Sequence, residues 1–118
     1  MTNTTQIFKI LSDDTRLRIL LLLKQTDLCV CEMSGILNVP QPKVSKNLAK
    51  LRDLNMVEDL RKEKFVYYSL KKDDALLMQI LDTVMTKSKD GTQFRLDMER
   101  MKDKDIYLNQ CQVITEIA

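Results

Sequence analysis

Three cysteines are the residues of this sequence with the most specific chemistry. Cys29 and Cys31 are separated by one residue, and Cys111 lies far from both along the chain. Thiolates are soft ligands that select soft ions. Cysteines this close rarely bridge each other. On its own the pair favours small buried hydrophobes, and a soft-ion site or a redox sensor stays open until the surrounding segment is considered.

Several kinds of chemistry are missing from the sequence. It contains no histidine, no Cys-x-x-Cys motif and no glycine-rich phosphate loop, so we expect no enzyme activity. The longest apolar run, Ile19 to Leu23, is too short to cross a bilayer, and no charged segment followed by an apolar run opens the chain. We therefore expect a cytoplasmic protein of 118 residues that forms one domain.

Positive charge is concentrated in the middle of the chain. The net charge is only +2, but residues 41–72 hold nine basic and four acidic side chains. Such a cluster is typical of a surface that binds phosphates, although a solvated surface would give the same count. Charge alone leaves nucleic-acid binding open.

Apolar spacing predicts several helices before this basic segment. We expect a short helix over 5–11, a buried helix that follows N-cap candidates at Ser12, Asp13 and Asp14, and a third helix over 28–37 capped by Asp27. Asn38-Val39-Pro40 ends the third helix. A fourth helix is predicted from Pro42, with Gln41 in the capping position.

The fourth helix has two distinct faces. Val44, Leu48 and Leu51 share the inner one. The opposite face carries the residues expected to contact DNA: Lys43, Lys46 and Lys50 for phosphates or guanine edges, and Gln41, Ser45 and Asn47 as base readers. Two helices joined by a short turn match a helix-turn-helix, whereas the alternative is a solvated surface helix.

A change to period-two spacing after Asn55 predicts a β-hairpin, and two helices should follow. The hairpin carries Arg61, Lys62 and Lys64 near its tip, where they could lie along a phosphate backbone. The loosely spaced apolar residues of the last helix need a partner. We therefore predict a fold that is mainly α with a small β-hairpin, a dimeric winged helix-turn-helix with recognition helix about 42–54, wing about 56–70 and C-terminal dimerisation helices about 72–117.

Four segments in this order resemble metalloregulatory repressors of the ArsR/SmtB type, over about residues 7–74. They are ILSDDTRLRILLLL, DLCVCEM, QPKVSKNLAKLRDLNMV and RKEKFVYYSL. The resemblance implies a homodimer that represses transcription at double-stranded operator DNA with two-fold symmetry and is released when an inducer binds. One departure is Asn47, where the family usually has His; Asn still donates and accepts hydrogen bonds.

The resemblance also limits the inducer. Relatives that bind zinc, cobalt or nickel on the fifth helix use His, which this chain lacks, and four-cysteine cadmium or lead sites need a cysteine before Cys29. The arsenite-responsive branch is the most similar, which implies arsenite or antimonite as inducer and no permanently bound cofactor. One form of its motif has a third cysteine where this chain has Ser34. Trivalent arsenic or antimony prefers three sulfurs in a pyramid, and Cys29 and Cys31 supply two of them. The third sulfur could be that of Cys111, could come from a small thiol in solution, or could be absent.

Two expectations follow for the cysteine pair. Residues two apart on an ideal helix point about 200° away from each other, so an ion bound by both should distort the first turn of the third helix. Thiols at a helix N-terminus should have a lowered pKa. Two other functions stay open on the same scaffold: a thiol redox switch, and a response to other soft metals such as cadmium, lead or zinc.

Overall fold

The computed structural model describes the backbone of residues 2–117 and the side chains of residues 3–110. In chain order the elements are α1 (Thr2–Leu11), α2 (Asp14–Leu23), β1 (Leu28–Cys29), α3 (Val30–Leu37), α4 (Gln41–Asp53), β2 (Val57–Lys62), β3 (Phe65–Leu70), α5 (Ala75–Ser88), α6 (Thr92–Met101) and α7 (Lys104–Ile117). Among the described residues, no helix is both long and apolar enough to cross a membrane.

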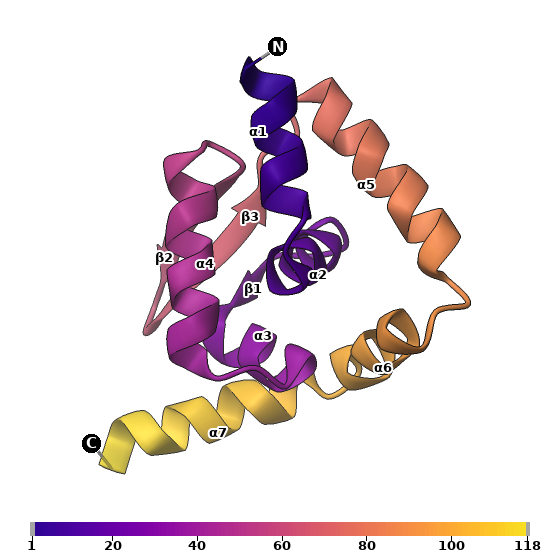
Figure 1. The fold of residues 1–118 in the computed structure, drawn as a ribbon. Helices are drawn as coiled ribbons and strands as arrows, with labels where there is room; N and C mark the ends of the chain where they lie inside the picture. Colours follow the sequence, from indigo (N-terminus) through magenta and orange to yellow (C-terminus); the bar gives the residue numbers. More distant parts are fainter. Residues whose placement is uncertain (1, 118) are drawn as a thin grey trace.

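Helix α2 lies at the centre of the molecule (Figure 1). Five consecutive residues, Ile19 to Leu23, are buried because helices and the sheet surround α2 on several sides. The carboxylate of Asp13 accepts a hydrogen bond from the Arg16 backbone N–H at 3.0 Å and begins the helix, as the sequence predicted. Burying these side chains is the main stabilisation of the fold, at roughly 2 kcal/mol for each large aliphatic side chain.

Helices α3 and α4 are joined by the short turn Asn38 to Pro40. Asn38 has a positive φ of 55°, the left-handed conformation with which helices commonly end. Helix α4 begins at Gln41 and its N-cap is Pro40, so the prediction that Gln41 caps this helix was wrong. Val44, Leu48 and Leu51 are fully buried beneath the helix, as their spacing predicted.

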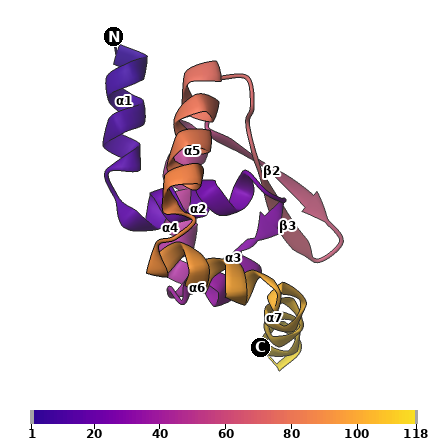
Figure 2. The same ribbon diagram turned by 90° about the vertical axis from the view of Figure 1, so that its right-hand side faces the viewer.

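The sheet has three antiparallel strands in the order β1-β3-β2. β2 and β3 form the predicted hairpin, whose turn is made by Glu63 with φ of 57° and Lys64. The hairpin projects from the helical body (Figure 2). The short strand β1 was not predicted: Leu28 and Cys29 pair with Tyr68 and Tyr67, which satisfies the free edge of β3. The third helix therefore begins at Val30, and Asp27 is not its cap.

The hairpin is followed by three helices, α5, α6 and α7, where the sequence predicted two, because the predicted last helix is divided in two. Helix α6 ends at Met101, and the Asp103 carbonyl accepts the first hydrogen bonds of α7. This break changes the chain direction. α6 packs beside α2 and α3, and α7 then crosses α3 in the opposite direction to it (Figure 1).

Candidate functional site

Cys29 and Cys31 lie on either side of the junction between β1 and α3. Cys29 has extended backbone angles, φ −94° and ψ 171°, and is the N-cap residue, whereas Cys31 is the second residue of the helix. The angular argument for two residues on one ideal helix therefore does not hold, because Cys29 precedes the helix. Both residues are buried, with 2% and 9% of their surface exposed.

Glu32 holds the start of α3. Its carboxylate accepts a hydrogen bond from the Cys29 backbone N–H at 3.0 Å, and its own backbone N–H donates to the Cys29 sulfur, which completes a capping box. Burial raises the pKa of the Cys29 thiol to about 11, and the charge of Glu32 adds to this effect. The expectation of a lowered pKa was wrong for Cys29, because desolvation outweighs the favourable position at the helix N-terminus.

The sulfur of Cys31 contacts the next helix. Nε2 of Gln41, the first residue of α4, donates a hydrogen bond to Cys31 Sγ at 3.7 Å. Cys31 is disulfide-bonded in this structure, whereas Cys29 is a free thiol. The side chain of Cys111, the third predicted ligand, lies outside the described residues. Within residues 3–110 no three Cys, Asp or Glu side chains are grouped to hold a metal ion.

Ser34 occupies the position where one form of the cysteine motif has a third thiol. Its hydroxyl donates a hydrogen bond to the Val39 carbonyl at 2.6 Å. The side chain therefore stabilises the turn between α3 and α4, and this serine has a structural role in the chain.

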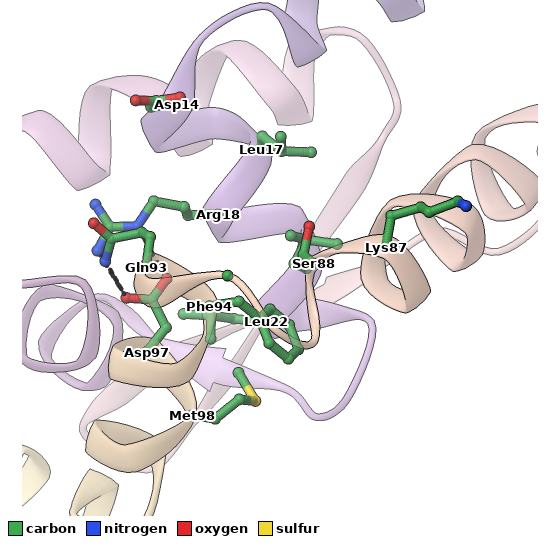
Figure 3. Close-up of a pocket in the computed structure, with 12 residues that line it drawn as sticks. Asp14, Leu17, Arg18, Leu22, Lys87, Ser88, Gln93, Phe94, Asp97 and Met98 are labelled. Atoms are coloured by element: carbon green, nitrogen blue, oxygen red, sulfur yellow. Dashed lines mark hydrogen bonds and ion pairs between the residues drawn. The ribbon is translucent and has the colours of Figure 1, made fainter.

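The other end of α3 is held by polar side chains. Arg18 of α2 donates to the Leu37 carbonyl at 2.7 Å and forms a salt bridge with Asp97 of α6 at 2.8 Å, and Asp97 points towards Arg18 in Figure 3. Arg100 donates to the Ile36 carbonyl at 3.3 Å. These groups satisfy carbonyls that no longer have a partner within the helix. The salt bridge lies at the edge of a cavity of about 400 Å³ between α2 and α6.

Gly35 lets α7 approach α3 closely. A Cβ atom added to Gly35 would collide with the ring of Tyr107, so only glycine fits under this aromatic ring. Sequence reasoning did not single out Gly35 or Tyr107. The sequence signal that could have identified Gly35 is its position inside a predicted helix. A glycine there lowers helix stability and is usually kept only where close packing requires it.

The predicted DNA-binding residues share the outer surface of α4. Gln41, Lys43, Ser45, Lys46 and Lys50 are exposed, and Asn47 is half-buried. The Asn47 amide donates to the Lys43 carbonyl at 2.9 Å, so one of its donors is used within its own helix. Lys43, Lys46 and Lys50 are available to phosphates, because none of them forms a salt bridge with a carboxylate among the described residues.

The hairpin adds a second basic surface. Arg61, Lys62 and Lys64 are all exposed around its tip, and Nζ of Lys62 lies 5.7 Å from the centre of the Tyr67 ring. Arg52 of α4 and Asp59 of β2 form a salt bridge of 3.4 Å between the helix and the hairpin. The hairpin is thus attached to the helix whose basic face it extends.

This arrangement defines a class of protein: a winged helix-turn-helix, with α4 in the place of the recognition helix and the β2–β3 hairpin as the wing. The sequence pattern described as "Bacterial regulatory protein, arsR family" matches residues 13–59. The chain belongs to this family of transcriptional regulators, and the predicted winged helix-turn-helix fold, mainly α with a small β-hairpin, is confirmed.

Individual relatives support the assignment. The arsenic resistance transcriptional regulator ArsR1 of Pseudomonas putida is 43% identical over 82 residues, which cover 64% of each chain. The arsenical resistance operon repressor of Escherichia coli is 47% identical over 66 residues, covering 55% of this chain and 56% of its own. The transcriptional repressor SdpR of Bacillus subtilis is 39% identical over 64 residues, covering 54% of this chain and 71% of its own.

Solved structures give the same fold. The antimony-specific transcriptional repressor AntR superposes with a TM-score of 0.64 at 25% identity, covering 76% of this chain and 80% of its own. This chain matches less than two thirds of the length of ArsR1 and of the Escherichia coli repressor. What those proteins bind is therefore carried to this chain only as a proposal.

Proposed function

We propose that this chain is a DNA-binding transcriptional repressor that leaves its operator when arsenite or antimonite binds to Cys29 and Cys31. The observation that carries the proposal is the position of two buried cysteines where the sheet, α3 and the first residue of α4 meet. The names of two relatives that are 43% and 47% identical to this chain over their matched lengths support arsenic as the inducer. The protein would act in the cytoplasm and catalyse no reaction.

The exchange chemistry suits neutral, buried thiols. Arsenous acid carries three hydroxyl groups; each thiol that replaces one forms an As–S bond, breaks an As–O bond and gives its proton to the leaving hydroxide as water. The disulfide at Cys31 must first be reduced by two electrons from a thiol reductant. Two thiols then release two waters, and the exchange itself changes no oxidation state. The raised pKa of Cys29 is therefore compatible with binding at neutral pH, because the thiol proton is consumed in the exchange.

We propose Cys111 as the third ligand. It follows Tyr107 by four residues, which is about one helical turn, and Tyr107 packs on Gly35, four residues after Cys31. This spacing, together with the opposite directions of α3 and α7, favours an intrachain site of three sulfurs over one completed by a solution thiol.

The thiol site can be tested directly. In reducing buffer, arsenite should release the wild-type protein from a DNA fragment selected from a random library, while Cys29→Ser and Cys31→Ser should stay bound. Ser34→Ala, on the same helix, is the matched control: it loses the hydrogen bond to Val39 but no sulfur, so arsenite should still release it from DNA. X-ray absorption should count three As–S bonds in the wild type and two in Cys111→Ser. Normal release of both Cys29→Ser and Cys31→Ser would contradict the proposal.

For DNA we propose that α4 enters the major groove and the wing lies along the backbone. Gln41, Ser45 and Asn47 would read bases, and the basic residues Lys43, Lys46, Lys50, Arg61, Lys62 and Lys64 would contact phosphates or guanine edges. Lys46→Ala should weaken binding and reduce the slope of log affinity against log salt by about 1 if Lys46 contacts one phosphate. An unchanged affinity and slope would remove Lys46 from the interface.

We further propose that the repressor is a homodimer and binds an operator with two-fold symmetry. Phe8 of α1 is 57% exposed and Leu76 of α5 is 37% exposed, and the two helices are linked by a hydrogen bond from Asn3 to Asp74 of 3.2 Å. Such exposed apolar side chains on neighbouring helices suit an interface between two copies. Phe8→Glu should shift the mass measured by light scattering from dimer to monomer and weaken operator binding.

A second candidate function is a thiol redox switch. It is favoured by the disulfide at Cys31. Two thiols would lose two protons and two electrons to an oxidant such as a peroxide and form the S–S bond. Operator release by peroxide, combined with full binding in excess arsenite under reducing conditions, would support this function and exclude the arsenite proposal.

A further inference from the structure

One hydrogen bond links the cysteine pair directly to the recognition helix. Gln41 and Cys31 are ten residues apart and belong to different helices, yet Gln41 Nε2 lies 3.7 Å from Cys31 Sγ. This distance is within the range for a hydrogen bond to sulfur. The sulfur is buried, while Gln41 is exposed on the surface expected to face DNA. A single side chain thus spans the distance between the two proposed functional surfaces.

The first turn of α4 lacks a side-chain cap. Its N-cap is Pro40, which has no side-chain hydrogen bond to offer, and the turn is held by the Pro40 carbonyl through the backbone N–H groups of Lys43 and Val44. Within the described residues, the Gln41 side chain donates a hydrogen bond to Cys31 Sγ. Because this sulfur is buried, the hydrogen bond fixes the orientation of the Gln41 amide.

We infer that Gln41 is a positioning residue whose amide connects the state of the Cys31 sulfur to the DNA-reading surface of α4. This inference rests on the proposed function and deepens it. A glutamine amide has two N–H donors and a carbonyl. With one N–H donated to the sulfur, the other N–H and the carbonyl are held in one orientation for a base edge.

Inducer binding would break this arrangement at the sulfur. In this structure the Cys31 sulfur accepts the bond while it is part of a disulfide. In the reduced protein, a soft ion bound to this sulfur would occupy the space beside it and move the sulfur away from Gln41 Nε2. The amide of Gln41 then loses its fixed orientation. The signal would reach the recognition helix even where α3 itself keeps its shape. One neutral hydrogen bond accounts for about a three- to tenfold change in an equilibrium constant.

Neighbouring residues of α4 supply a matched comparison. Ser45 lies one turn after Gln41 on the same exposed surface, so it shares the proposed contact with DNA. Ser45→Ala is therefore the control: it removes a proposed base contact from the same helix but no hydrogen bond to Cys31. Gln41→Met keeps the length and shape of the side chain and removes the N–H donor.

The first experiment measures the effect of arsenite. The dissociation constant for a library-selected DNA fragment is measured in reducing buffer with and without arsenite, and the ratio of the two values is compared. Gln41→Met should reduce the wild-type ratio about three- to tenfold, whereas Ser45→Ala should weaken DNA binding and keep the ratio. A ratio in Gln41→Met within twofold of the wild type would overturn the inference.

A second experiment needs no arsenite, so it separates the inference from the proposed function. A double-mutant cycle on DNA affinity combines Gln41→Met with Cys31→Ala in the reduced protein. The two changes should be non-additive by about threefold or more, because each removes the same hydrogen bond. Additive effects would overturn the inference. Non-additive effects without any response of the wild type to arsenite would uphold the link and refute the proposed inducer.

Discussion

The two ends of α3 are held by different kinds of interaction. At the N-terminal end are two cysteines, the carboxylate of Glu32 and one long hydrogen bond from Gln41. At the C-terminal end, side chains from α2 and α6 donate to the Leu37 and Ile36 carbonyls. The first end depends on groups that a soft ion can alter. The second depends on charged hydrogen bonds that such an ion does not affect.

This difference suggests how a small helix can report a chemical change. An eight-residue helix is too short to be stable by itself, so its position depends on its neighbours. With one end fixed, a change at the other end rotates or unwinds the first turn without disrupting the core. The C-terminal contacts should therefore determine stability, and the N-terminal contacts should determine the response to the inducer.

The largest effect is expected from Asp97→Ala. Asp97 is 3% exposed and pairs with Arg18, so its removal leaves a partly buried guanidinium without its carboxylate. Breaking a buried ion pair in this way costs about 3 kcal/mol of unfolding free energy. Urea denaturation followed by circular dichroism would measure it. Arsenite should still release the variant from DNA wherever it remains folded; loss of the response in folded protein would contradict the division between the two ends.

Gly35→Ala should have the next largest effect, because the new methyl group would collide with the Tyr107 ring. We expect a loss of about 1–3 kcal/mol, as in other overpacked contacts. In a Tyr107→Ala background the same Gly35→Ala change should cost less unfolding free energy, because the ring with which the methyl group collides is absent. If Gly35→Ala is as stable as the wild type in urea, α7 does not pack on α3 as described.

Much of the fold could be predicted because periodic patterns are local. The buried face of α4, the cap at Asp13 and the β2–β3 hairpin each follow from residues within a few positions of one another. Strand β1 could not be predicted in this way. Leu28 and Cys29 are strand residues only because Tyr67 and Tyr68 offer an unpaired edge, and this partner lies about forty residues away.

The candidate site was predicted in its residue types but not in its contacts. Cys29 and Cys31 within the segment DLCVCEM indicated soft-ion chemistry, and the basic residues of α4 indicated DNA. The N-cap role of Cys29 follows from long-range pairing, and the Gln41 contact follows from how α3 and α4 pack. The raised pKa of Cys29 has the same origin, since burial depends on the whole fold.

A smaller effect is expected from Glu32→Ala, which removes the carboxylate that accepts from the Cys29 N–H. The buried N–H would lose its partner, and we expect a loss of about 1–2 kcal/mol in urea denaturation. Cys29 should also ionise more easily, because the negative charge of Glu32 is removed. Alkylation of the Cys29 thiol in a Cys31→Ser/Cys111→Ser background should be faster at pH 8. An unchanged alkylation rate would show that Glu32 does not influence this thiol.

The smallest effect is confined to alkaline solution. The folded Cys29 has a pKa of about 11 against 9.0 for an exposed thiol, so the unfolded chain ionises first. Stability from the neutral buried thiol is present below pH 9 and is lost as the pH rises towards 11. Between pH 9 and 10 the protein with Cys29 should lose about 1 kcal/mol more unfolding free energy than the protein with Cys29→Ala, in which this thiol is absent. The comparison is made in reducing buffer, with Cys31 and Cys111 replaced by Ser in both proteins, so that only Cys29 differs. Parallel pH profiles for the two proteins would mean that the buried end of α3 does not hold Cys29 in its neutral form.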